Sequence, residues 1–249
     1  MKLCVLVPAY NCAHFLPELV ERITLPGKDD EIIVVDDSSD DDTEKVAKSL
    51  PRVIVKKNPK NLGYGGTSQR LYELAAERGA DITINMHGDL GHRPEDMPLL
   101  FERLQRNDCD IVVGSRLQFI YKSASQEGWL KCLYSPELRG GMPLIRLFGH
   151  VATTTFQNLC FGTNLHSFHE GMRGCSRPVI DWILKTEFST WYNYDVEVLL
   201  SAYRYGFRIA EIPVAPNYTD HAKSSAPPFR YGLKVVEHAW KTYRGNNRK

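Results

Sequence analysis

The stretch "ITINMHGDLGHRPED" covers residues 82–96 and joins two kinds of sequence. Its largely apolar run from Ile82 to Met86 is typical of a buried strand in an α/β protein, and it ends abruptly in His, Gly and Asp residues. Loops that follow such strands in open parallel sheets are the usual place for ligands. The stretch therefore predicts both a fold class and the position of a binding site.

Strand and helix patterns alternate along the first half of the chain. The predicted strands are 3–8, 31–36, 52–57, 81–86 and 110–115, and the predicted helices are 13–24, a segment starting near Asp40, 65–79 and 94–105. Alternating units of this length predict an α/β fold whose sheet is mainly parallel, with helices on both faces.

The alternation stops after Arg116. Residues 117–142 contain several glycines and prolines and show no clear period, so we expect a mobile loop there. Beyond this loop we expect helices over 143–161, 176–185 and about 194–205, a strand over 207–214 and a terminal helix. The 143–161 helix carries one apolar stripe, formed by Leu144, Leu147, Phe148, Val151, Ala152, Phe156 and Leu159.

Composition limits the classes of protein that fit. The chain has 249 residues, enough for one large domain, and its net charge of +1 gives no electrostatic reason to expect nucleic acid as a partner. Six scattered cysteines without a C-x-x-C pair suggest neither a zinc site nor a disulfide framework. No stretch approaches the roughly 18 apolar residues that span a bilayer. We therefore expect a cytoplasmic protein, soluble or peripheral on a membrane.

Polar, glycine-containing loops follow all five predicted strands. They read "PAYN", "DDSSDDDT", "NPKNLGYGG", "HGDLGH" and "GSR" in chain order. Asp36 and Asp37 stand where a strand ends, so they either form a simple turn or accept hydrogen bonds from a nucleobase or ribose. The "GYGG" at 63–66 is compatible with a tight turn or with a weak phosphate loop. Together the loops predict a ligand crevice.

His87 and Asp89 flank Gly88, so both side chains can point to the same side of an extended turn. An imidazole nitrogen and a carboxylate oxygen suit Mn²⁺, with a substrate diphosphate supplying further oxygens. The alternative is that Asp89 caps the helix beginning at Pro94 while His87 hydrogen-bonds locally. We expect His92 to be structural.

Taken in order, "VPAYN", "VVDDSSDDDT", "NLGYGG", the acidic turn, "GSR", "GMRGCSR" and "GFRIAEIPV" resemble the family 2 glycosyltransferases, above all the dolichyl- or polyprenyl-phosphate mannose or glucose synthases. The resemblance covers nearly the whole chain. It implies a single GT-A domain, a nucleoside-diphosphate sugar donor, a divalent metal (Mn²⁺ or Mg²⁺) and inversion at the anomeric carbon. Residues 1–116 would be the nucleotide-sugar-binding half, and 117–249 the acceptor-side half.

The resemblance also implies roles for single residues. The nucleoside would be held by Pro8, Ala9, Tyr10 and Asp37, the metal and diphosphate by Asp89 with His87, the sugar or diphosphate by Arg116, and the rest of the donor by Gly65, Gly88, Arg146 and Arg173. The 143–161 helix resembles the amphipathic helix through which such synthases meet a lipid acceptor. Its alternative interpretation is a helix that packs in the core.

The chain departs from the family pattern at the acidic turn. The usual D-x-D reads His87-Gly88-Asp89, and the glutamine that often follows is Gly91. A subset of bacterial members carries the same H-G-D. Because a neutral imidazole compensates less cationic charge, we expect weaker metal affinity. The basic C-terminal segment of the family is altered to "HAKSS", where His221 or Lys223 would supply the positive charge.

Three functions remain open at this point. The first is transfer of a hexose from a GDP- or UDP-sugar to a polyprenyl phosphate, an anionic nucleophile that needs no strong base. The second is transfer to a hydroxyl of a soluble glycan or metabolite, which needs a base, and Asp195 and Glu197 are candidates unless they are solvated carboxylates on a helix surface. The third is a degenerate protein that binds nucleotides without turnover.

Overall fold

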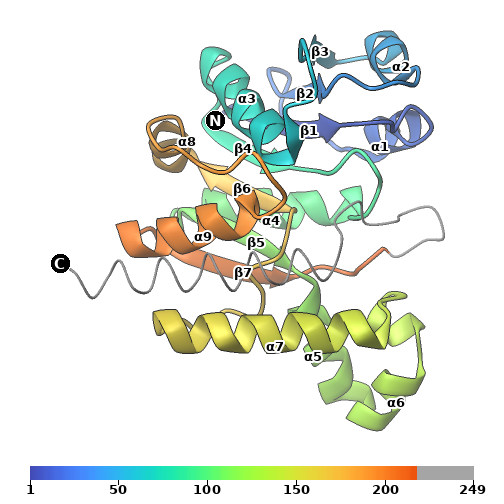
Figure 1. The fold of residues 1–249 in the computed structure, drawn as a ribbon, viewed down its shortest axis with the longest axis vertical. Coiled ribbons are helices and arrows are strands. Elements are labelled where there is room, and N and C mark those ends of the chain that lie inside the picture. The colour runs from blue at the N-terminus through green and yellow to red at the C-terminus, as the bar shows by residue number, and fades with distance from the viewer. Residues whose placement is uncertain (218–249) are drawn as a thin grey trace.

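The computed structural model describes residues 1–217, and a twisted sheet with helices on both faces forms its centre (Figure 1). Within these residues the sheet has seven strands in the order β3-β2-β1-β4-β6-β5-β7. The strands are β1 (Leu3–Ala9), β2 (Glu31–Asp36), β3 (Val53–Lys57), β4 (Ile82–Asn85), β5 (Ile111–Ser115), β6 (Arg173–Ser176) and β7 (Ile209–Pro213). The helices are α1 (Leu16–Arg22), α2 (Thr43–Ser49), α3 (Gly63–Glu77), α4 (Met97–Gln105), α5 (Arg116–Glu127), α6 (Trp129–Tyr134), α7 (Leu144–Phe161), α8 (Arg177–Ile183) and α9 (Tyr194–Tyr205).

Side-chain alternation along the central strands builds two cores, one on each face of the sheet. In β1, Leu3, Val5 and Val7 pack against α1 and α4, whereas Cys4 and Leu6 pack against α3, α8 and α9. A strand buried on both faces must be apolar throughout, which is why the near-continuous apolar runs predicted these strands correctly. The predicted mainly parallel α/β sheet is confirmed.

The sequence predicted no element in the segment "GMRGCS", but the structure has a strand there. Residues 173–176 form β6, which lies antiparallel between β4 and β5. Four residues that include a charged Arg173 and two small side chains carry no strand pattern of their own. The two flanking strands decide the conformation, because they offer hydrogen-bonding edges on both sides.

The mobile loop predicted over 117–142 is also wrong. The structure places α5, α6 and the short 3₁₀ helix Glu137–Arg139 there, around a satellite core that includes Leu117, Ile120 and Ala124. These side chains do recur at helical spacing. Gly128, with φ of +90°, ends α5 and lets α6 start at once, so this glycine marks a helix end and not disorder.

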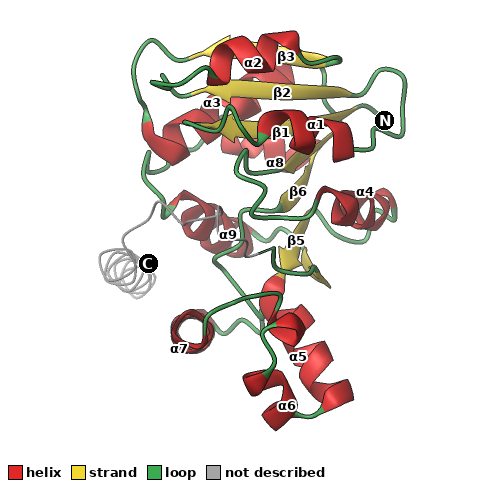
Figure 2. Ribbon diagram, turned by 90° about the vertical axis from the view of Figure 1, so that its right-hand side faces the viewer, coloured by secondary structure: helices red, strands yellow, loops and turns green. Residues whose placement is uncertain are grey.

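Helix α7 confirms the predicted helix over 143–161, but most of its apolar stripe points away from the core. Within the stripe Leu147 is buried, whereas Phe148 is 59% and Leu159 80% exposed, and Ile145 beside the stripe is 81% exposed. The face turned inward carries the buried polar residues Thr154 and Gln157. Leu147 and Val151 pack in the satellite core with α5, so the core-packing interpretation holds for one part of the stripe and not for the exposed part. Figure 2 shows α5, α6 and α7 together beyond one end of the sheet.

The helices predicted over 176–185 and about 194–205 and the strand predicted over 207–214 are confirmed as α8, α9 and β7. All six cysteines are free thiols. Among residues 1–217 no helix combines the length and the apolar character that a bilayer crossing requires. The predicted terminal helix, His221 and Lys223 lie outside the described residues.

Candidate active site

The loops predicted to hold a ligand meet at the carboxyl ends of β1, β2 and β4. Backbone hydrogen bonds connect them: Asp37 N donates to Ala9 O at 2.8 Å, and Gly88 N donates to Pro8 O at 3.4 Å. Pro8 and Ala9 are therefore the floor of this edge, while the side chain of Tyr10 stands at its rim, 50% exposed. The structure thus brings the "PAYN", "DDSS" and "HGDLGH" loops together.

Asp37 is committed to the start of α3. Its Oδ1 accepts from Leu62 N at 2.8 Å and from Asn58 Nδ2 at 2.8 Å, and its Oδ2 accepts from Gly63 N at 2.9 Å. A carboxylate that accepts the first amides of a helix also complements its dipole. A nucleoside N–H that reached Asp37 would have to share these oxygens.

Gly65, expected among the donor-binding residues, serves close packing in the structure. Its amide donates to Thr190 O at 2.9 Å, and a Cβ at this position would lie 2.2 Å from Ser189 O. The glycine thus lets the segment before α9 approach α3 closely.

Asp89 does not cap the helix at Pro94, so that alternative is wrong. Its Oδ1 instead accepts from Gly91 N at 2.9 Å inside the turn, and the 3₁₀ helix at Pro94 has no side-chain cap. Gly88 is required by its surroundings, because a Cβ there would lie 2.9 Å from the Cys12 sulfur and 3.2 Å from Pro8 O. The tight floor under Gly88 fixes where His87 and Asp89 leave the backbone.

His87 is held by α3 and by the segment before β6. Its Nε2 lies 3.0 Å from the Tyr64 hydroxyl, and a Cβ on Gly171 would lie only 2.1 Å from the same nitrogen. His92 packs edge-on against His87 and is 3% exposed. Burial, Arg116 and His87 together lower the pKa of His92 far below its usual range, which agrees with a structural, neutral His92.

Asp195 and Glu197 are not surface carboxylates, so the solvated alternative is wrong for both. Asp195 accepts from Arg173 Nη2 at 2.8 Å and from the Tyr64 hydroxyl at 2.8 Å. Glu197 accepts from Ser189 N at 2.8 Å and from the Asn193 side chain. Asp195 therefore joins the His87 side of the site, whereas the contacts of Glu197 lie in the loop before α9.

Arg173, expected near the donor, is instead the largest wholly buried side chain of the described chain. Its Nη2 donates to Asp195 Oδ1 at 2.8 Å, and its Nη1 donates to the backbone carbonyl of Asp195 at 3.1 Å. Arg173 thus reaches the site only through Asp195.

Arg116 begins α5 at the end of β5 and is held by a residue that the sequence did not point out. Its Nε donates to Glu170 Oε2 at 2.7 Å, its backbone N to Glu170 Oε1 at 3.2 Å, and its Nη2 to His169 O at 3.1 Å. Glu170 is wholly buried, and desolvation raises its pKa while Arg116 opposes the rise. The only sequence signal for Glu170 was its place in "EGMRGCS".

Arg146, in the first turn of α7, lies in the same region as Arg116. We call this region, which also includes His150, His169 and Glu170, the Arg116 corner. Burial lowers the pKa of His150 far below its usual range, and the charges of Arg116 and Arg146 contribute. His150 in turn packs against His169, whose backbone holds Arg116. Arg116 and Arg146 therefore both lie near His150.

Comparison of the sequence with profiles of known protein families identifies the family. The family profile "Glycosyl transferase family 2" matches residues 4–182, which include both the H-G-D turn and the Arg116 corner. The chain belongs to glycosyl transferase family 2. It is thus a family 2 glycosyltransferase, as the ordered motifs indicated.

Its relatives include polyprenyl-phosphate sugar transferases. It is 24% identical to the UDP-N-acetylglucosamine–dolichyl-phosphate N-acetylglucosaminyltransferase of Methanococcus voltae, over 92% of this chain and 91% of the relative. It is 26% identical to the undecaprenyl-phosphate mannosyltransferase of Micrococcus luteus, over 86% and 83%. A dolichol-phosphate mannosyltransferase of Pyrococcus furiosus is 36% identical, but over only 52% of this chain and 36% of the relative.

Solved structures confirm the GT-A fold. The glucosyl-3-phosphoglycerate synthase of Mycobacterium tuberculosis with Mn²⁺ and UDP-glucose superposes with a TM-score of 0.66 at 19% identity. The match covers 98% of this glycosyltransferase and 79% of that chain. A complex of the same synthase with UDP gives the same TM-score.

The metal-ligating side chains at this site, Asp89 and His87, fit a divalent cation that takes most of its ligands from a bound substrate and from water. Within residues 1–217 no three His, Cys, Asp or Glu side chains are grouped to hold a metal ion. Asp89 has one carboxylate oxygen without a hydrogen bond in that part of the chain, and His87 uses only one ring nitrogen. One oxygen and one nitrogen would leave the remaining positions to a diphosphate and water, and an imidazole suits Mn²⁺ better than Mg²⁺.

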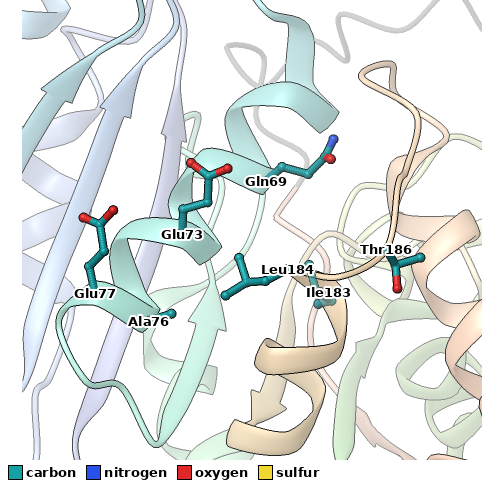
Figure 3. Close-up of a pocket in the computed structure, with 7 residues that line it drawn as sticks. All are labelled: Gln69, Glu73, Ala76, Glu77, Ile183, Leu184 and Thr186. Carbon is teal, nitrogen blue, oxygen red and sulfur yellow. The ribbon is translucent and has the colours of Figure 1, made fainter.

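A pocket elsewhere in the glycosyltransferase contains none of the predicted site residues. It lies between the second half of α3 and the end of α8, and its lining includes Glu73, Glu77 and Leu184 (Figure 3). The candidate site remains the carboxyl edge of the sheet, where the predicted loops meet.

Proposed function

We propose that this glycosyltransferase moves a hexose from a UDP- or GDP-sugar to a polyprenyl or dolichyl phosphate, with inversion at the anomeric carbon. The observation that carries the proposal is the position of Arg146. It lies on α7 between Ile145 and Phe148, which are exposed, and on the same side of the site as Arg116. A cation at the border between an apolar surface and a polar site suits an acceptor with a phosphate head and an apolar tail.

The leaving group of the reaction is the nucleoside diphosphate, and negative charge develops on it as the glycosidic bond breaks. Asp89 and His87 are the residues that would hold a divalent cation, which when bound supplies positive charge for that diphosphate. Arg116 contributes a fixed cation whose orientation Glu170 and His169 set before the reaction starts. Preorganised charge of this kind lowers the barrier because it needs no rearrangement.

The state of Asp195 favours a phosphate acceptor over a hydroxyl acceptor. A hydroxyl nucleophile needs a base to take its proton, whereas a phosphate is already an anion. Asp195 and Glu197 were the candidates for that base. The oxygens of Asp195 accept from Arg173 and Tyr64, and those of Glu197 accept from Ser189 N and from the Asn193 side chain. The hydroxyl alternative would therefore require another base.

The same surface supports peripheral contact with the cytoplasmic face of a membrane. Ile145, Phe148 and Leu159 follow one stripe of α7, and Trp129 and Leu130 of α6 are 52% and 73% exposed. Figure 2 shows α6 and α7 at the same end of the molecule. Aromatic and aliphatic side chains beside a basic residue are typical of interfacial helices.

The test is a transfer assay with radiolabelled UDP- and GDP-sugars, Mn²⁺ or Mg²⁺, and a polyprenyl phosphate in detergent. We expect labelled product in the organic phase with one donor and not the other. Label that instead moves to a soluble glycan or metabolite would select the hydroxyl alternative. Absence of transfer together with retained nucleotide binding would select the degenerate binding protein.

A further inference from the structure

We propose that Tyr64 and Asp195 are positioning residues that hold neutral His87 in one tautomer, with the proton on Nε2 and the lone pair on Nδ1. Nothing in the sequence connects these three residues, since Tyr64 and Asp195 are 131 positions apart. The tautomer is a property of the fold alone. Its use as a metal ligand rests on the function proposed above.

The chain of contacts starts at Arg173, which is wholly buried in β6. Its Nη2 donates to Asp195 Oδ1 at 2.8 Å and its Nη1 to Asp195 O at 3.1 Å. A guanidinium has only donors, so Asp195 Oδ1 acts as an acceptor in this contact. Asp195 Oδ2 accepts from the Tyr64 hydroxyl at 2.8 Å, so both oxygens of the carboxylate are acceptors.

The Tyr64 hydroxyl can donate only one hydrogen bond, and two side chains lie within hydrogen-bond distance of it. The hydroxyl lies 2.8 Å from Asp195 Oδ2 and 3.0 Å from His87 Nε2. The carboxylate is the stronger acceptor, so the hydroxyl donates its hydrogen bond to Asp195 Oδ2. The lone pairs of the phenol oxygen then face His87.

Only a donor at His87 Nε2 can complete this arrangement. If Nε2 were the unprotonated nitrogen, two lone pairs would face each other at 3.0 Å. The ring is also confined, because Gly171 lies against it so closely that a Cβ there would be 2.3 Å from Cε1. His92 packs edge-on at a ring-centroid distance of 5.4 Å. The proton of the neutral ring is therefore on Nε2 and the lone pair is on Nδ1.

This arrangement gives His87 the form that a metal ligand needs. A histidine ligand coordinates through an unprotonated nitrogen, and a hydrogen bond from its other nitrogen usually fixes which one that is. Tyr64 plays that part here, and Asp195 and Arg173 support it. The H-G-D turn would then keep a defined ligand at the place where relatives with D-x-D have a carboxylate.

The direct test is ¹⁵N NMR of the imidazole at a pH where His87 is neutral, with the resonances assigned by loss in a His87→Gln variant. We expect a protonated-type Nε2 and an unprotonated-type Nδ1 in the wild-type protein. The opposite pattern, or an even mixture of the two tautomers, would overturn the proposal.

Asp195→Asn is the sharpest variant because it can invert the tautomer without changing the shape of the side chain. The amide oxygen keeps the contact with Arg173, and the amide nitrogen then donates to the phenol oxygen of Tyr64. The phenol proton must turn to His87 Nε2, so we expect the proton of His87 on Nδ1. An unchanged tautomer in a folded Asp195→Asn protein would overturn the proposal.

Tyr64→Phe is the second variant, in case Asp195→Asn does not fold. It removes the phenol oxygen that accepts the hydrogen bond from His87 Nε2, and we therefore expect a mixture of both tautomers of His87. Tyr192→Phe is the matched control. The Tyr192 ring stacks on Tyr64 with ring centroids 6.3 Å apart, but within the described residues Tyr192 makes no hydrogen bond to His87. A tautomer ratio that Tyr64→Phe leaves at the wild-type value would contradict the inference.

Mn²⁺ binding, followed by electron paramagnetic resonance with UDP or GDP present, tests the use of the lone pair. We expect Asp195→Asn to weaken Mn²⁺ affinity about ten-fold or more, as loss of an outer contact to a histidine ligand does, and Tyr192→Phe to leave it unchanged. If the wild-type protein binds nucleotide but no Mn²⁺, the metal part of the proposed function fails. The NMR result would still decide the tautomer by itself.

Discussion

Two buried arginine–carboxylate pairs frame the site, and they differ in how far water reaches them. Arg173 and Asp195 have side chains that are 0% and 9% exposed, whereas Arg116 is 14% exposed over a Glu170 that is wholly buried. Arg173 forms its ion pair with Asp195 in the protein interior, and it is connected to the site only through Asp195, Tyr64 and His87. Arg116 keeps part of its side chain exposed to solvent. Burial thus separates an arginine that supports the site from one that can meet a ligand.

The largest effect on stability is expected from Arg173→Met. This change leaves Asp195 buried without its counter-charge, and breaking such a pair costs about 3–5 kcal/mol. Urea unfolding of the variant measures the loss. The double variant Arg173→Met with Asp195→Asn should recover part of it, because no uncompensated charge remains. Equal stability of the single variant and the wild type would end the comparison.

Arg116→Gln should instead lower catalysis more than stability. Loss of a preorganised cation typically costs about 100-fold or more in rate. The stability loss should be smaller than for Arg173→Met, because burial already raises the pKa of Glu170 and the carboxyl can take up a proton. Parallel measurements of kcat/KM and of urea unfolding distinguish the two effects. Retained activity would show that Arg116 is structural like Arg173.

The Arg116 corner should also make the protein sensitive to mild acid. Burial, together with Arg116, lowers the pKa of His150 far below its usual range and that of His169 to about 4. Below about pH 6.5 the unfolded chain binds protons that these folded rings refuse, so stability falls as pH decreases toward 4. Each ring contributes up to about 1.4 kcal/mol per pH unit. A free energy of unfolding that stays flat between pH 6.5 and 5 would contradict this.

The smallest effect is expected at an exposed pair of the same chemistry. Arg177 contacts Asp181 at 2.8 Å on the surface of α8, and both side chains are more than 40% exposed. Arg177→Gln should change the free energy of unfolding by less than about 0.5 kcal/mol, because water and salt screen such pairs. A loss comparable to that of Arg173→Met would mean that burial is not what separates the pairs.

The parts of the site that were predicted correctly lie next to strands with strong local patterns. The loops after β1, β2 and β4 were placed at one edge because parallel strands all end there, and the structure confirms it. Other parts depend on distant partners. Gly65 was assigned to the donor and packs against Thr190, and Glu170 was overlooked because its importance comes from Arg116, 54 positions away.

By itself the sequence determined the α/β architecture, the family and the edge at which the site lies. It could do so because apolar periodicity and turn residues act between near neighbours in the chain. Only the tertiary structure decided that β6 pairs between β4 and β5, that α7 turns apolar side chains outward, and that Asp195 meets Tyr64 and Arg173. Each of these depends on packing and hydrogen bonds between segments far apart in sequence, and no local pattern records such contacts.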